Sequence, residues 1–314
     1  MDAHLSGAKS ELSPAQGRLL IVLAAVLWST SSFFNKILTK PTSLGLHEPS
    51  IEAFPLAFFR VLFAGLFLVP TLRKKDISFR PFMLVMAISF AVMNLSYMAA
   101  MTWGKAATAV LLQYTAPMWM YCASIWLLNE RPRFRNTMAV GVGLLGVIVI
   151  MIGQWGNENP WAVSLGLTSG VTYGAILICL RILRNESANW LTIWNQLAGA
   201  LVLLPFFFLY PLPRVSQLAV LVLFGAFQLG LPYWLMARGL RVVSPQEAGA
   251  ITLLEPVLNA IWAYLVSPET ETPTTATYIG GGLILGGLAY RYWPSRTHPA
   301  DSIQESEDLT NGPK

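Results

Sequence analysis

The chain has 314 residues, of which 54% are hydrophobic and only 12% are charged. A soluble domain has about 25% charged residues, so a chain this poor in charge cannot cover a water-exposed surface. The composition therefore excludes an ordinary soluble enzyme and predicts an integral membrane protein. The formal net charge of +5 would suit a nucleic-acid partner, so the positions of the basic residues decide what that charge means.

Ten apolar runs follow one another along the chain, and each is close to the roughly 20 residues that a membrane-crossing helix needs. They cover residues 19–38, 52–72, 80–101, 106–128, 137–154, 161–182, 190–210, 216–237, 246–266 and 275–293. The first run lacks a small-residue cleavage site, so we expect it to stay as a membrane helix. The chain is predicted to be all-α, with ten transmembrane helices between a tail at 1–18 and a disordered tail at 294–314.

The Lys and Arg residues alternate between the connections in the way that the positive-inside rule describes. With a cytoplasmic N-terminus, sixteen of them fall in cytoplasmic segments, and only Lys40, Lys105 and Arg214 fall outside. We therefore predict a multi-pass protein of the cell membrane with both termini in the cytoplasm. The basic charge then faces the lipid surface, and no nucleic-acid partner is expected.

The second half of the chain weakly repeats the first. Residues 109–117 align with residues 248–256, and the same offset pairs Gly141 with Gly280. An ordered series of such matches through several apolar runs indicates an internal duplication.

Each predicted repeat, at residues 19–155 and 160–293, contains five apolar runs. Because five is odd, the two repeats must enter the membrane in opposite orientations. Inverted repeats are typical of secondary transporters, whose substrate site lies near the bilayer midplane between the two halves. This pattern favours transport over a structural or receptor role.

Several short motifs in these runs resemble the EamA family of the drug/metabolite transporter superfamily. They are Trp28-Ser29, Phe59-Arg60, the segment 106–109 leading to Pro117, Asn129-Glu130-Arg131-Pro132, and in the second half Ala248, Pro256, Glu269 and Gly280-Gly281-Gly282. The resemblance covers about residues 19–293. It implies a ten-helix exporter of amino acids and other small metabolites, with a central cavity. Asn195 stands where the family pattern of the second repeat has an arginine.

Glu255 is the most informative polar residue because it lies ten residues into the ninth run. Thr252, Glu255, Pro256 and Asn259 share one helical face. A charged group at the midplane costs about 2.5–3.5 kcal/mol on insertion scales and calls for a reason. Glu255 is predicted to bind a substrate amine or a coupling proton. The alternative is a structural ion pair with Arg60, which lies at a similar depth.

Other polar and aromatic side chains within the runs are predicted to line a substrate cavity. They are Trp28, Asn94, Tyr97, Gln113, Tyr114, Tyr173, Gln228 and Tyr233. The aromatic rings would attract an amine through cation–π contacts, and ordinary core packing is the alternative. Pro117 and Pro256 are predicted to kink their helices and to free a backbone carbonyl for other partners. Lys36 lies near a helix end, and we expect its side chain to extend to the interface.

Glycines spaced four residues apart are typical of closely packed membrane helices. Gly166, Gly170 and Gly174 have this spacing, as do Gly282 and Gly286. Packing within the chain is the first interpretation, and a homodimer contact is the second.

The predicted function is secondary transport of a small polar metabolite, an amino acid or related zwitterion, with export as the expected direction. Alternatives are carriers of sugars, nucleotide-sugars or other anions, and a membrane-embedded lipid-modifying enzyme. Anionic cargo would need several cations in the cavity, and an enzyme would need clustered acidic or histidine residues. The sequence shows neither pattern, so no catalytic residue, metal or cofactor is predicted.

Overall fold

The computed structural model describes residues 12–42, 44–127, 129, 131–153 and 159–293. Helices form the whole regular structure of these residues. The helices of the first half are α1 (Pro14–Ser29), α2 (Ser31–Thr39), α3 (Ala53–Leu68), η1 (Val69–Thr71), η2 (Lys74–Asp76), α4 (Pro81–Trp103), α5 (Ala106–Gln113), α6 (Ala116–Leu127) and α7 (Phe134–Gly153). Those of the second half are α8 (Pro160–Ile182), α9 (Ala188–Phe207), α10 (Val215–Leu223), η3 (Phe224–Gly230), α11 (Leu231–Gly239), α12 (Pro245–Thr252), α13 (Leu254–Val266), α14 (Pro268–Glu271) and α15 (Thr275–Tyr292).

Eight helical segments of the described chain are long and apolar enough to cross a membrane. They correspond to eight of the ten predicted runs. In the run at 106–128 the helix is interrupted between α5 and α6, and the run at 275–293 forms the 18-residue helix α15. Large apolar side chains such as Leu145, Leu201 and Leu265 are exposed on the helix surfaces, where lipid is the favourable environment.

Local sequence explains where several of the helices begin. The Ser13 side chain accepts a hydrogen bond from the backbone N–H of Gln16, and the Gln16 side chain accepts one from the backbone N–H of Ser13, before the proline at the first position of α1. The side chains of Asn159 and Ser244 also accept a backbone hydrogen bond at the starts of α8 and α12, and each residue is followed by a proline. A proline at the first helical position loses nothing, because its missing N–H has no partner within the helix.

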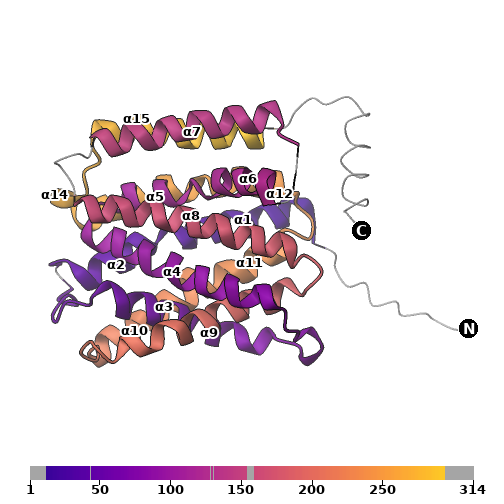
Figure 1. Cartoon of the computed structure of the whole chain (residues 1–314). Helices are drawn as coiled ribbons and strands as arrows, with labels where there is room; N and C mark the ends of the chain where they lie inside the picture. Colours follow the sequence, from indigo (N-terminus) through magenta and orange to yellow (C-terminus); the bar gives the residue numbers. More distant parts are fainter. Residues whose placement is uncertain (1–11, 43, 128, 130, 154–158, 294–314) are drawn as a thin grey trace, which may run out of the picture.

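The helices lie roughly side by side in a layered bundle (Figure 1), with α7 and α15 packed together at one edge. Gly146 and Gly280 allow this contact, because a Cβ at either position would meet the other residue's carbonyl oxygen at 2.5 Å. Gly166, Gly170 and Gly174 pack in the same manner against residues of α5 and α6, whereas Gly282 and Gly286 face open space.

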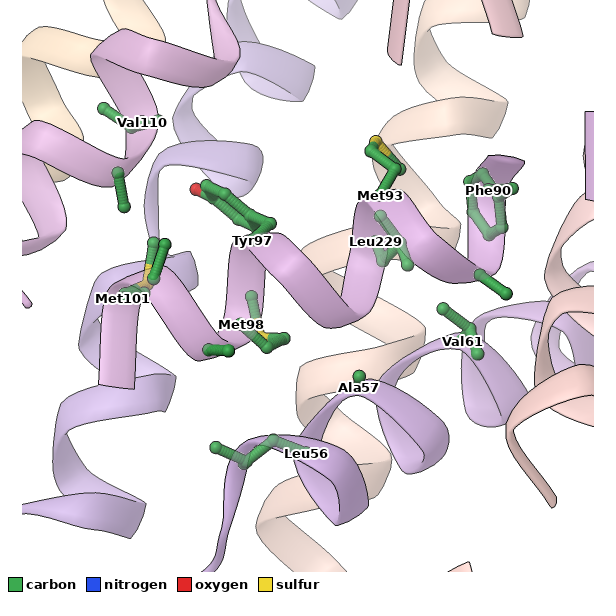
Figure 2. Close-up of a cluster of buried hydrophobic side chains, with 14 of the residues drawn as sticks. Leu56, Ala57, Val61, Phe90, Met93, Tyr97, Met98, Met101, Val110 and Leu229 are labelled. Carbon is green, nitrogen blue, oxygen red and sulfur yellow. The ribbon is translucent and has the colours of Figure 1, made fainter. Parts of the chain in front are cut away.

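The core lies where α3, α4, α5 and η3 meet (Figure 2). Leu56 and Val61 of α3 and Met98 and Met101 of α4 are all buried in this cluster. Methionine side chains are flexible, so they fill the irregular spaces between helices that cross at different angles.

Figure 1 also separates the two ends of the bundle. One end has α2 and α14, and the other has α12. This second end carries Arg18, Arg135, Arg238, Arg241 and Arg291, and we call it the arginine-rich end.

Candidate functional site

A cavity of about 430 Å³ lies inside the bundle. Its walls come from helices of both halves: α1, α3, α4, α5, α6, α8, η3, α11, α12, α13 and α15. The lining extends from Arg60 and Asn94, in the middle of their helices, to Leu240, Pro245 and Tyr292 at helix ends. The last three residues belong to the arginine-rich end, so the cavity reaches that end of the bundle.

Most of the residues that the sequence predicted for a substrate site line this cavity. They are Trp28, Asn94, Gln113, Tyr114, Tyr173, Tyr233, Thr252 and Glu255. They come from segments up to 227 residues apart, so the fold gathers them in one place. Whether they bind a substrate stays a prediction.

Three of the predicted residues, Tyr97, Gln228 and Asn259, are not among the lining residues of the cavity. Tyr97 Oη lies 3.0 Å from Ser31 Oγ, and Asn259 Nδ2 donates to the same oxygen at 2.7 Å. Gln228 accepts from Arg60 and donates to the backbone oxygen of Trp28 at 2.9 Å. These hydrogen bonds hold the start of α2 and the side chain of Arg60 in place.

At the two predicted proline kinks the helices are interrupted for one or two residues. Helix α5 ends at Gln113 and α6 starts one residue before Pro117, while α12 ends at Thr252 and α13 starts two residues before Pro256. A proline has no N–H for the carbonyl four residues earlier, which for Pro256 is the carbonyl of Thr252. Both breaks lie against the cavity, because Tyr114 and Leu253 at these breaks line it.

Tyr114 connects the two breaks. Its Oη lies 2.7 Å from the freed carbonyl oxygen of Thr252 and 2.8 Å from Oε2 of Glu255. A phenol has one proton and can donate one hydrogen bond. When Glu255 is protonated, it can donate to Tyr114 Oη while Tyr114 donates to Thr252. When Glu255 is ionised, its carboxylate and the carbonyl oxygen of Thr252 compete for the single proton of Tyr114. The hydrogen bonding of Tyr114 therefore depends on the charge on Glu255.

Arg60 is held by neutral partners. Its Nε donates to Gln228 at 2.9 Å and its Nη1 donates to Asn94 at 2.6 Å. The guanidinium carbon also lies over the rings of Tyr97 and Phe224, at 5.7 and 5.4 Å from their centroids. The ion pair with Glu255 that the sequence suggested is not formed in the described part of the chain. Amides and aromatic faces solvate the cation instead.

Arg60 and Glu255 are the two charged side chains among the described residues that line the cavity. They have opposite signs, they come from α3 and α13, and they do not pair with each other. Separated opposite charges on one cavity suit a ligand that has both a positive and a negative group.

The sequence did not identify the apolar part of the lining. Phe90, Met93, Leu177 and Met236 line the cavity, and nothing in their local sequence separates them from lipid-facing or core residues. Tyr292, at the end of α15, also lines it.

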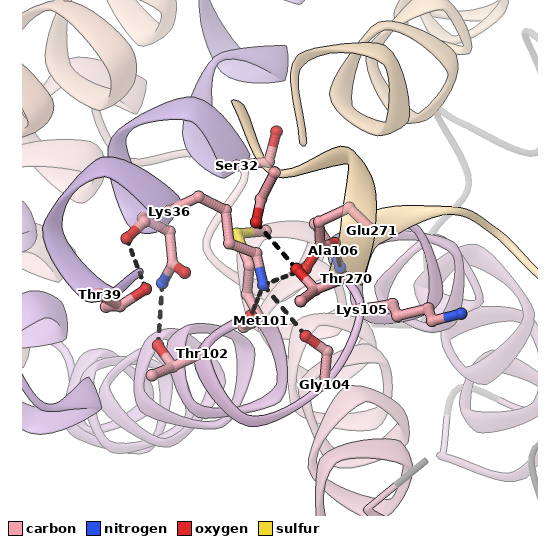
Figure 3. Close-up of polar contacts among 12 residues, drawn as sticks. Ser32, Lys36, Thr39, Met101, Thr102, Gly104, Lys105, Ala106, Thr270 and Glu271 are labelled. Atoms are coloured by element: carbon pink, nitrogen blue, oxygen red, sulfur yellow. Dashed lines mark hydrogen bonds and ion pairs between the residues drawn. The ribbon is translucent and has the colours of Figure 1, made fainter. Parts of the chain in front are cut away.

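The expectation for Lys36 was wrong. Its side chain is completely buried, and Nζ lies 2.5 Å from Oε1 of Glu271, which is 2% exposed. Lys36 also donates to the backbone oxygens of Met101 and Gly104 at 2.7 and 3.1 Å (Figure 3). Oε2 of Glu271 accepts from the backbone N–H of Ala106 at 2.8 Å, in the first turn of α5, where a negative charge is favoured. This group lies at the end of the bundle opposite the arginine-rich end.

Comparison with known proteins identifies the family. Residues 15–152 and again residues 160–292 match the EamA-like transporter family. The chain belongs to this family. It is thus a multi-pass membrane protein of the drug/metabolite transporter type.

Two relatives illustrate the range of the match. A protein of Archaeoglobus fulgidus described as an uncharacterized transporter is 28% identical over 87% of this chain and 94% of its own length. An S-adenosylmethionine uptake transporter of Rickettsia felis is 24% identical over 81% of this chain and 86% of its own. A solved crystal structure superposes with a TM-score of 0.60 over 90% of this chain and 99% of that chain at 20% identity, which shows a shared fold.

Proposed function

We propose that the protein is a secondary transporter of a small zwitterion, an amino acid or a close relative. The observation that supports this most directly is that two opposite charges, Arg60 and Glu255, line one cavity without forming an ion pair with each other. A buried charge without a counter-ion is unfavourable. A zwitterion would supply a counter-ion to each at once.

The surroundings of each charge suit one end of such a ligand. The ammonium group would bind at Glu255, near the aromatic side chains of Trp28, Tyr173 and Tyr233. Trp28 and Tyr233 pack edge to face with ring centroids 5.3 Å apart, so their orientation is already set. The carboxylate would bind the guanidinium of Arg60, which Asn94 and Gln228 hold in place.

The named relative supports an amine-bearing substrate. S-adenosylmethionine, the substrate in the name of the Rickettsia felis protein, contains an amino-acid group with an ammonium and a carboxylate. A nucleotide-sugar or another anion fits less well, because the described lining of the cavity has one cationic side chain, Arg60, and also a carboxylate, Glu255.

We propose that transport proceeds by alternating access in a bundle of ten transmembrane helices arranged as two inverted repeats. The double match to the family, over 15–152 and 160–292, supports two related halves. The positive-inside rule makes the arginine-rich end cytoplasmic. The cavity would then be accessible from the cytoplasm, with Lys36 and Glu271 closing the outer end.

We propose export as the net direction, because a cavity that reaches the cytoplasmic end can load there. The Rickettsia felis relative is named for uptake, so direction needs its own measurement. Protein inserted in one known orientation in vesicles should move labelled substrate faster from the cytoplasmic face. Faster movement from the other face would contradict export.

Counterflow in proteoliposomes tests the proposal as a whole. Vesicles loaded with unlabelled amino acids should accumulate labelled amino acids in a saturable manner, and Glu255→Gln should lower this accumulation strongly. Labelled nucleotide-sugars and simple carboxylates serve as the contrasting cargo. Exchange of those anions without exchange of amino acids would overturn the zwitterion site.

A further inference from the structure

A second, smaller pocket adjoins the cavity. It has a volume of about 70 Å³, more than the roughly 30 Å³ that one water occupies in the liquid. The two spaces share five lining residues: Phe90, Tyr173, Leu177, Leu180 and Tyr233. The small pocket, called the side pocket below, is therefore a lateral extension of the cavity towards α9.

Two neighbouring amides of α9 line the side pocket, and both are buried. Gln196 is fully buried and Asn195 is 6% exposed. Both amide atoms of Gln196 and Oδ1 of Asn195 have no hydrogen-bond partner among the described residues. Buried amide groups normally have partners, because leaving them without one costs free energy.

Gln217 of α10 shows what a structural buried glutamine is like in this protein. It is 1% exposed, and its Nε2 donates to the backbone oxygens of Leu46 and Pro49 at 2.8 and 2.7 Å. Its Oε1 accepts from the backbone of Arg214 at 2.9 Å. Gln196 has the same burial and none of these contacts, so protein packing alone does not explain its polarity.

The lining of the side pocket also limits what it can bind. Its other residues are aromatic or aliphatic apart from Thr192, and the described residues provide no charged side chain there. An ionised group would lose its water without gaining a counter-charge. An uncharged group with both a donor and an acceptor would match the unused donor and acceptors of Gln196 and Asn195.

We propose that the side pocket is a specificity subsite for an uncharged donor–acceptor group on the substrate, a carboxamide or its equivalent. The inference rests on the proposed function, since the same ligand would place its ammonium at Glu255 and its carboxylate at Arg60. The preferred substrates are thus amino acids whose side chain ends in an amide, in preference to apolar side chains of equal length.

L-Glutamine and L-methionine make a suitable pair of probes, because both are zwitterions with unbranched side chains of similar size. Binding of each is measured to the purified full-length protein in lipid, for the wild type and for Gln196→Met and Asn195→Leu. The wild type should bind L-glutamine about tenfold more tightly than L-methionine. Each substitution should remove most of this preference, mainly by weakening the binding of L-glutamine.

Stability measurements separate this role from a structural one. Gln196→Met and Asn195→Leu replace unpartnered amides by apolar groups of similar shape, so neither should lower the melting temperature. The control, Gln217→Met, breaks three hydrogen bonds and should lower it without changing the ratio of the two affinities. A lower melting temperature for both pocket variants would overturn the proposal.

The outcomes also distinguish the subsite from the transporter proposal. Equal affinities of the wild type for the two amino acids, or an equal loss of both in the pocket variants, would overturn the subsite alone. If Glu255→Gln binds both probes as well as the wild type does, or the wild type binds neither, the zwitterion site itself is wrong and the subsite is rejected with it.

Discussion

Among the described residues, charged side chains lie inside the bundle at two places, and their surroundings are opposite in kind. Lys36 and Glu271 lie in direct contact, and backbone oxygens and an N–H complete their hydrogen bonds. Arg60 and Glu255 share a cavity, yet each is held by neutral groups and they do not pair. The first arrangement leaves little for a ligand to satisfy, whereas the second leaves both charges available. Whether the two opposite charges contact each other therefore distinguishes a structural ion pair from a candidate binding site better than their burial does.

Removing one partner of the structural pair should have the largest effect. Lys36→Met leaves the carboxylate of Glu271 buried without its counter-ion, so we expect a loss of about 3–5 kcal/mol of stability. Thermal unfolding in lipid or detergent measures this. Lys105→Met is the matched control at the same end, because Lys105 is half-buried and, among the described residues, its ammonium donates to the backbone oxygen of Thr272 rather than to a carboxylate. Equal destabilisation by both substitutions would contradict the comparison.

Removing the charge of Glu255 should leave the fold intact and weaken ligand binding. Glu255→Gln keeps a side chain that can contact Tyr114, and we expect a loss of about 10- to 100-fold in the affinity for an amino acid. Wild-type binding should weaken as the pH falls and Glu255 takes up a proton. The other titratable groups around it are Arg60, Tyr97, Tyr114, Tyr173 and Tyr233. Acid changes the charge of none of them, because Arg60 stays cationic and the tyrosines stay neutral.

Isothermal titration at several pH values tests this expectation. The acid-induced weakening should disappear in Glu255→Gln. Glu247→Gln is the control, because Glu247 of α12 forms an ion pair with Arg18 of α1 and is not among the lining residues of the cavity. A variant of Glu255 that keeps the wild-type pH profile would show that another group is responsible.

Loosening the support of Arg60 should have a smaller effect. Asn94→Leu removes the acceptor of the 2.6 Å hydrogen bond from Nη1, so the guanidinium should bind a carboxylate about fivefold less tightly. The affinity for an amine without a carboxylate should not change. Asn189→Leu is the matched control, since Asn189 bonds to Thr71 away from the cavity. Equal losses for amine and amino acid would argue against a carboxylate at Arg60.

The smallest effect is expected at the surface pair of Glu186 and Arg80. Hydrogen bonds from Ser78 and from Arg80 hold the pKa of Glu186 below its ordinary value. A lowered folded-state pKa means that this contribution to stability is present at neutral pH and is lost as the pH falls through that pKa. Glu186→Gln should therefore lower the melting temperature slightly at pH 7 and not at all in strong acid. A larger effect in acid would contradict this assignment.

The helical architecture could be predicted from the sequence because long apolar runs have one stable form in a membrane. The run predicted at 161–182 matches α8 (Pro160–Ile182) closely. The break between α1 and α2 was not predicted, because no proline marks it. There Ser29 and Thr30 donate their hydroxyl protons to the carbonyls of Val26 and Leu27, and such bonds compete with the helix.

The polar half of the cavity could also be predicted, since a polar side chain in the middle of a membrane helix rarely faces lipid. The partners of those side chains could not. Lys36 and Glu271 are 235 residues apart, and only the fold brings them together. A hydropathy pattern likewise cannot show that Gln196 lacks a hydrogen-bond partner, because that depends on which groups the neighbouring helices place beside it.

The most direct test of the central claim is to bind three matched ligands to the wild type, Glu255→Gln and Arg60→Gln. The ligands are an L-amino acid, the amine that lacks its carboxylate and the acid that lacks its ammonium. We predict that the wild type binds the amino acid most tightly. Glu255→Gln should bind the amino acid no more tightly than the acid that lacks the ammonium. Arg60→Gln should bind the amino acid no more tightly than the amine that lacks the carboxylate. If both variants bind all three ligands as the wild type does, Arg60 and Glu255 do not form a zwitterion site.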